Sequence, residues 1–200
     1  MRSRTLLSLA FLLLVAACAK WGAVEPRQQV IEGRLQLTPP ITFSRIVFPV
    51  SRDRLQMWTV DGPSLNQMLV LPELGHRMAL LAEPSGADRA NPTYPLFRST
   101  MAEPEIMELI ADTLSIAFQK VPVSTSNLQP TTFAERPGFR FDFTFSSRED
   151  LDYRGTFIGG VDNGTLAGVM LVATAVHHYD TLRPELERLA ASARRIRAAS

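Results

Sequence analysis

One stretch of sequence decides the fold: Phe139-Arg140-Phe141-Asp142-Phe143-Thr144-Phe145, in which every second residue is phenylalanine and the residues between are polar. Successive side chains of a β-strand point to opposite faces of a sheet. This period of two therefore predicts a strand with one buried face and one face exposed to solvent.

The chain downstream predicts two more strands. Residues 146–152 are a polar turn, and residues 153–161 return as the next strand. Asp162-Asn163-Gly164 is typical of a tight hairpin turn. Residues 166–175 are apolar at nearly every position, as expected of a strand that is covered on both faces. We therefore expect a three-stranded meander whose last strand lies at the centre of the sheet.

Three strands and two helices complete the predicted domain. Residues 41–50, 54–60 and 67–71 have the composition of strands. Thr100 and Glu103 have the spacing of a capping box, and Pro104 suits the first turn of a helix. A final helix begins near Asp180 or Thr181, with Pro184 in its first turn. The predicted fold class is α+β, a single domain over residues 37–200 in which two helices pack on an antiparallel sheet of about six or seven strands.

The amino-terminal segment has the pattern of a secretory leader. Arg2 and Arg4 precede an apolar run over residues 6–17, which ends in small residues suited to a signal peptidase. A helix that spans a bilayer needs roughly 20 apolar residues, so this run is too short to remain as an anchor. We expect residues 1–17 to be a signal peptide that is cut between Ala17 and Cys18. Residues 18–36 carry no sustained period and are predicted to be a tether, with packing of part of the segment on the domain as the alternative.

The residues at the predicted cleavage site, Val15-Ala16-Ala17-Cys18, resemble the lipobox of bacterial prolipoproteins. This resemblance implies that Cys18 carries a diacylglyceryl group and that the new amino end is acylated with a fatty acid such as palmitate. The protein would then be anchored on the periplasmic side of the bacterial envelope, and Ala19 after the cysteine favours the outer membrane. Several acyl chains hold a protein on a bilayer almost permanently. The alternative is an ordinary secretory leader, or a core cysteine that falls near the cleavage site.

The charge of the chain excludes nucleic acid as a partner. Formal net charge is +1, and it becomes −1 when the leader takes Arg2 and Arg4 with it. Nucleic-acid binding needs a net basic surface or a concentrated basic face. The only arginine-rich place is the carboxyl end, with Arg188, Arg194, Arg195 and Arg197. We interpret these arginines as cations in the last turns of a helix, where they complement its dipole, with an anionic membrane surface as an alternative contact.

His177, His178 and Asp180 are the candidate site for a reactive cluster, because they lie where the last strand meets the last helix. Adjacent residues of an extended chain point to opposite faces, so the two histidines cannot both bind one metal ion without a bend. The simpler interpretation has one histidine in the core and Asp180 as the helix cap. No catalytic residue, metal site or cofactor is predicted, because no serine elbow and no nucleotide loop occurs, and the glycines at 155, 159, 160 and 164 punctuate a hairpin.

The order of predicted elements resembles the PsbP-like fold, an antiparallel sheet sandwiched by helices. Three segments also resemble uncharacterised proteobacterial lipoproteins: residues 57–65, residues 97–109 and residues 136–141. This resemblance implies no activity and no functional residue. PsbP-like domains act elsewhere as assembly or binding modules, which is an analogy of fold alone.

Three function classes remain open after these observations. The favoured one is a lipid-anchored binding or assembly module, not an enzyme, whose partner is another envelope protein or a small ligand in a groove at one end of the sheet. The second is a metal-dependent or hydrolytic envelope enzyme that uses His177, His178 and Asp180. The third, a purely structural spacer, predicts no pocket with convergent polar side chains.

Overall fold

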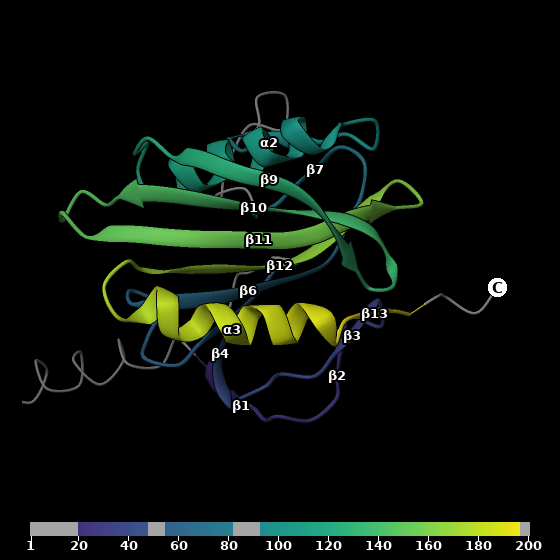
Figure 1. Ribbon diagram of the computed structural model, residues 1–200, viewed down its shortest axis with the longest axis horizontal. Coiled ribbons are helices and arrows are strands. Elements are labelled where there is room, and N and C mark those ends of the chain that lie inside the picture. The colour runs from purple at the N-terminus through teal and green to yellow at the C-terminus, as the bar shows by residue number, and fades with distance from the viewer. Residues whose placement is uncertain (1–19, 48–54, 82–92, 197–200) are drawn as a thin grey trace, which may run out of the picture.

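A computed structural model describes residues 20–47, 55–81 and 93–196. Within these residues the chain forms an antiparallel main sheet with two helices on opposite faces (Figure 1). The eight strands of this sheet are, in spatial order, β1 (Lys20–Val24), β4 (Phe43–Val47), β5 (Gln56–Thr59), β6 (Asn66–Leu74), β12 (Thr165–Thr174), β11 (Asp152–Asp162), β10 (Arg136–Ser146) and β9 (Ser124–Phe133). The predicted α+β class, an antiparallel sheet packed by two helices, is confirmed.

Two small sheets and two helices complete the described structure. One small sheet has the order β13 (Arg194–Arg195), β3 (Leu35–Leu37) and β2 (Gln29–Ile31), and the other pairs β7 (Met78–Ala79) with β8 (Leu96–Phe97). The helices are α2 (Glu103–Ala117) and α3 (His178–Ala191). Neither is long and apolar enough to cross a bilayer, and no other helix of the described residues is.

The central strands follow the patterns that predicted them. All four phenylalanines of β10 are at most 5% exposed. β12 lies beside β6 in the middle of the sheet, and every residue of β12 after Thr165 is buried. Asn163 and Gly164 join β11 to β12 with φ of 51° and 74°, the positive values that a tight hairpin turn requires.

The sheet separates two hydrophobic clusters, which places one helix on each face. Along β12, Val169 and Leu171 pack with leucines of α3, whereas Met170 and Val172 pack with α2. The phenylalanines of β10 all belong to the cluster beneath α2. Figure 1 accordingly shows α3 on the near side of β6 and β12, and α2 on the far side of the sheet. The molecule is thus a three-layer sandwich.

Both predicted helix starts need correction by about two residues. The residue before α2 is Ala102, not Thr100, and its N–H donates to Glu105 Oε2 at 2.7 Å, so Glu105 and not Glu103 supplies the capping carboxylate. Helix α3 begins at His178, earlier than predicted, and Pro184 lies inside it. Asp180 does not cap this helix but belongs to its first turn, where a negative charge still complements the helix dipole.

The amino-terminal part of the described chain is folded, which corrects the tether predicted over residues 18–36. β1 pairs along its length with β4 at one edge of the main sheet, and β2 pairs with β3. Val24, Ile31 and Leu35 are buried in the cluster beneath α3. Among the side chains that the structure describes, β1 and β2 each bury one apolar residue and β3 buries two, so no period marks these strands in the sequence. The signal peptide, its cleavage site at Ala17 and the predicted lipid site at Cys18 lie outside the described residues.

The sequence patterns also missed the other edge of the sheet, β9. Only Phe133 is buried among its residues, and Pro130 lies within it. Proline lacks a backbone donor and is tolerated at a sheet edge, where one side of the strand has no partner. An edge strand with one fully buried residue has no clear alternation to recognise, which explains why only six or seven strands are predicted.

Candidate binding site at one end of the sheet

The three residues of the predicted reactive cluster do not converge. His177 is exposed and has a φ of 70° immediately before α3. His178 places Nδ1 2.8 Å from the hydroxyl of Thr174 and Nε2 3.6 Å from a carboxylate oxygen of Asp61. Asp180 instead pairs with Arg154 at 3.1 Å. Across residues 20–47, 55–81 and 93–196, no group of three or more histidine, cysteine or acidic side chains is arranged to hold a metal ion.

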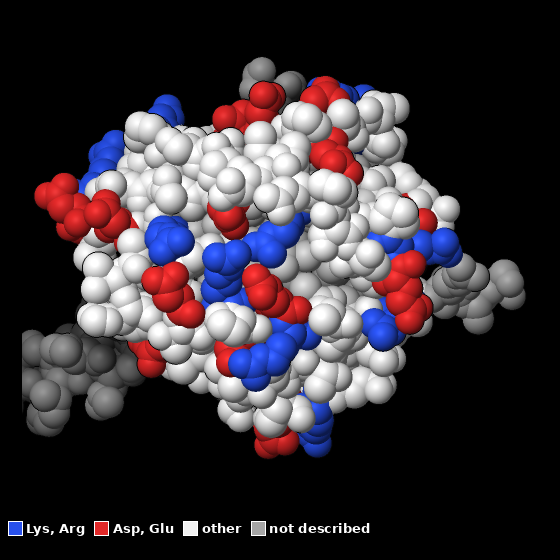
Figure 2. Space-filling model, viewed as in Figure 1, with Lys and Arg blue, Asp and Glu red and all other residues white. Residues whose placement is uncertain are grey.

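Charged side chains on the α3 face neutralise one another. Figure 2 shows basic and acidic side chains interleaved across this face. Glu187 of α3 lies 3.4 Å from both Arg140 and Arg183. The guanidinium of Arg154, besides pairing with Asp180, lies 4.2 Å from the ring centroid of Tyr179. These contacts fasten the helix to the exposed side of β10 and β11, and they leave little free charge for a ligand.

A buried hydrogen-bond chain reinforces this attachment. The hydroxyl of Thr156 donates to Asp142 Oδ1 at 2.6 Å and lies 2.7 Å from the hydroxyl of Tyr179. Since the single proton of Thr156 is given to Asp142, Tyr179 is the donor of the second bond. Thr156 and Tyr179 are at most 2% exposed, so these groups would be costly to leave unpaired.

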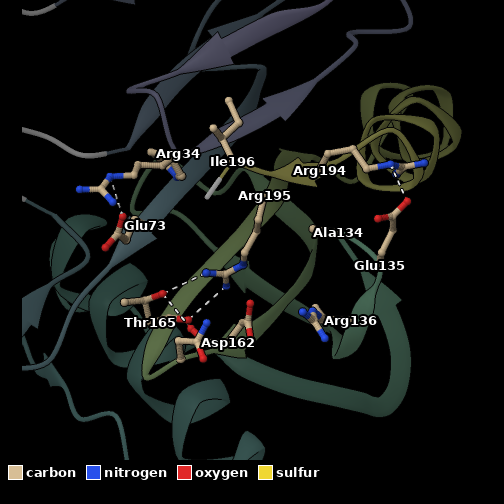
Figure 3. Close-up of a pocket in the computed structure, with 12 residues that line it drawn as sticks. Arg34, Glu73, Ala134, Glu135, Arg136, Asp162, Thr165, Arg194, Arg195 and Ile196 are labelled. Atoms are coloured by element: carbon tan, nitrogen blue, oxygen red, sulfur yellow. Dashed lines mark hydrogen bonds and ion pairs between the residues drawn. The ribbon is translucent and has the colours of Figure 1, made fainter. Parts of the chain in front are cut away.

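A pocket of about 500 Å³ opens where the hairpin turns meet the carboxyl-terminal strand. Its wall is built from five places in the sequence: the turn before β3, the end of β6, the β9–β10 turn, the β11–β12 turn, and β13 with the residue after it. Small-molecule sites in proteins have volumes of roughly 300–1,000 Å³. Figure 3 shows that arginines line this pocket from opposite sides.

Arg195 of β13 extends into the wall of the pocket toward Thr165 (Figure 3). Its Nη1 donates to Thr165 Oγ1 at 2.9 Å, and its Nη2 donates to the carbonyl oxygens of Gly160 at 3.0 Å and Thr165 at 3.1 Å. Burial lowers the pKa of the Arg195 guanidinium, while the negative charges of Asp162 and Glu73 act in the opposite direction. An arginine nonetheless stays protonated in proteins. The result is a positive charge held in fixed position by neutral oxygen atoms.

The other charges of the pocket are distributed around its rim. Arg34 pairs with Glu73 at 3.1 Å, and Arg194 pairs with Glu135 at 2.9 Å. Arg136, the first residue of β10, is exposed and its guanidinium has no hydrogen bond or ion pair within the part of the chain that the structure describes. Two of the four lining arginines are thus neutralised by a direct partner, and two are not.

The sequence predicts a groove at one end of the sheet but does not identify the residues that line this pocket. The sequence pattern predicts Arg194 and Arg195 in the last turns of a helix, but α3 ends at Ala191 and the two arginines form a strand that pairs with β3. Only the tertiary fold brings Arg136 and the 162–165 turn to the same place. The available signal was the group Arg194, Arg195 and Arg197, which has no acidic residue after Glu187 to balance it.

Comparisons with known proteins support the fold and nothing further. No protein-family model matches the sequence, and no curated protein matches it. Among solved structures, the protein is similar to cyanobacterial PsbP (CyanoP) from Synechocystis sp. PCC 6803, with a TM-score of 0.52 and 9% sequence identity over 90% of this chain and 93% of that one. Such an identity carries no information on activity. The predicted PsbP-like fold is confirmed, and the lipoprotein assignment stays a prediction.

Proposed function

We propose that the protein is a lipid-anchored binding module of the bacterial cell envelope, and not an enzyme. In this proposal acyl chains on Cys18 hold the mature protein on the periplasmic side of a membrane, with the outer membrane favoured by Ala19. The folded domain then recognises another envelope protein or a small ligand. The lipobox residues 15–18 and the short apolar leader support the anchor.

The position of β1 gives this anchor a geometric consequence. β1 begins at Lys20, so Ala19 alone separates it from Cys18. A residue of extended chain spans at most about 3.6 Å, so two such steps reach only about 7 Å. A lipidated Cys18 would therefore hold this edge of the sheet against the bilayer surface and would not let the domain extend far from it.

The pocket at the end of the sheet is the observation that carries the binding role. A structural spacer has no need for a preformed cavity with convergent charged side chains, whereas a binding module does. The guanidinium of Arg195 is fixed in the wall by three hydrogen bonds, so little side-chain entropy is lost when a ligand binds beside it.

Photo-crosslinking from the pocket tests this function in intact bacteria. The exposed pocket residue Asn163 is replaced by a photoreactive phenylalanine analogue, and the exposed α2 residue Glu108 is replaced in the same way as the control. We expect position 163 to yield a discrete adduct, seen as a gel shift for a protein or a mass increment for a small ligand, and position 108 to yield none. No adduct from position 163, or the same adducts from both positions, would overturn the proposal.

A further inference from the structure

The charged groups that line the pocket do not balance. Once the pairs Arg34 with Glu73 and Arg194 with Glu135 are set aside, Arg195, Arg136 and Asp162 remain. None of these three side chains makes an ion pair within the described residues. Asp162 is close enough to influence Arg195 electrostatically, but it supplies only one negative charge against two positive ones. The remaining excess is one positive charge.

Arg195 is held so that part of its hydrogen-bonding capacity is unused. A guanidinium has five N–H donors. Three of them serve the oxygens of Thr165 and Gly160, which leaves the Nε donor and one Nη1 donor without an acceptor in the described part of the chain. Guanidinium donors match the oxygens of carboxylate and phosphate groups, and such charge-assisted bonds are stronger than neutral ones.

Arg136 and Asp162 line the same pocket as Arg195. Figure 3 shows Arg195 extending from β13 toward Thr165, with Asp162 close to the end of its side chain and Arg136 on the opposite side of Asp162 from Thr165. Arg136 begins β10 and Asp162 ends β11, so both are fixed to the rigid sheet and not to a long loop. The rest of the wall includes the apolar side chains of Pro72, Ala134 and Ile196.

We propose that this pocket binds a small ligand through one oxyanion group, a carboxylate or a phosphate, held by Arg195 and Arg136. The proposal rests on the binding role proposed above and specifies the chemistry of its ligand. An anion with a single negative charge restores neutrality among the three unpaired side chains. The apolar part of the wall accommodates the non-ionic remainder of the ligand.

Titration of the full mature protein in a neutral detergent tests the proposal. The probes are inorganic phosphate and acetate, added at constant ionic strength so that general screening does not change, and binding is followed by amide NMR shifts. The test variant is Arg136→Gln, which removes an exposed charge without breaking a contact of the described structure. The control is Arg148→Gln, which removes an exposed arginine from the turn at the opposite end of β11.

We expect saturable binding of at least one probe, with shifts concentrated at residues 160–165 and 194–196. Affinity should fall about tenfold or more in Arg136→Gln and stay unchanged in Arg148→Gln, because one charge-assisted hydrogen bond contributes on this order. Arg195→Lys keeps the positive charge but loses the planar guanidinium, whose paired N–H donors match an oxyanion. This variant should therefore also weaken binding. Absence of saturable binding for both probes, or equal affinity in Arg136→Gln and the original protein, would overturn the proposal.

Two further measurements complete the test. Competition with lipid vesicles distinguishes a lipid headgroup from a free ligand, and comparison with the crosslinking result distinguishes failure of the oxyanion proposal from failure of the binding role. Displacement of the bound probe by phosphatidylglycerol vesicles, but not by phosphatidylcholine vesicles, supports the site with a lipid headgroup as the source. No displacement by either vesicle supports a free ligand. If position 163 still crosslinks a partner while neither probe binds, the oxyanion proposal fails and the binding role stands.

Discussion

Gly155→Ala should be among the most destabilising single-methyl changes in this protein. Gly155 lies in β11 opposite Phe143 of β10. A Cβ atom at position 155 would overlap the ring of Phe143 and lie 2.5 Å from the carbonyl oxygen of Leu171. Phe143 is 1% exposed, so its ring has no solvent into which it can move.

The magnitude follows from what must shift to accommodate the methyl group. Overpacking a well-filled core costs roughly 1–3 kcal/mol, and the upper end applies because one of the two obstacles is backbone in the neighbouring strand β12. For a protein of this size, about 3 kcal/mol corresponds to a fall in Tm of about 6–12 °C. The matched control is Gly22→Ala in the edge strand β1, where a Cβ atom meets only the flexible end of Arg45 at 3.8 Å. That change should be neutral or stabilising, because alanine costs less backbone entropy than glycine.

Urea unfolding followed by circular dichroism measures the free energy of unfolding of both variants. A double-mutant cycle with Phe143→Leu tests whether the Phe143 ring causes the loss of stability in Gly155→Ala. If the ring is one of the obstacles, the combined cost of Phe143→Leu and Gly155→Ala should be smaller than the sum of the single costs by about 1 kcal/mol. Phe143→Leu should recover only part of the stability that Gly155→Ala loses, because the carbonyl oxygen of Leu171 still obstructs the added methyl group. The reasoning is refuted if Gly155→Ala unfolds at the same urea concentration as Gly22→Ala.

Two more predictions concern buried tyrosines. Burial, and secondarily the charge of Glu149, raises the pKa of Tyr153, whose hydroxyl donates to the carbonyl oxygen of Ser64 at 2.7 Å. The folded state therefore favours the protonated phenol. The stabilisation that Tyr153 gives the folded state is fully present below pH 10, its ordinary pKa, and is lost as the pH rises through its higher pKa in the folded state. The free energy of unfolding should fall less steeply above pH 10 in Tyr153→Phe than in the original protein, and parallel curves would contradict this. Tyr179→Phe removes the donor to Thr156 and should lower the free energy of unfolding by about 1 kcal/mol in urea titrations, so an unchanged midpoint would show that this bond contributes nothing.

The centre of the fold was predictable because burial leaves a pattern in the sequence. The alternating phenylalanines of β10 and the continuous apolar run of β12 each reflect the faces against which they pack. β1 and β9 leave no such pattern, because an edge strand contributes few core residues and only Phe133 of β9 is fully buried. The buried residues of β2 and β3 are too few to produce a period.

The pocket was not predictable for a different reason. Arg195 follows the last helix by only a few residues, and local reasoning assigned it to that helix. Its actual position depends on the pairing of β13 with β3, whose partner residues are separated from it by most of the chain. The His177, His178 and Asp180 grouping failed in the opposite way, because neighbours in sequence took different partners in space.

Intact-mass and amino-terminal peptide analysis of the protein purified from bacterial membranes tests the central claim most directly. A lipid-anchored envelope module predicts a mature chain that begins at Cys18 and carries the mass of a diacylglyceryl group, with a further acyl chain on its amino group. A Cys18→Ser variant should lose this added mass and leave the membrane fraction. An unmodified Cys18 within the mature chain, or a Cys18→Ser variant that stays fully in the membrane fraction, would contradict the claim.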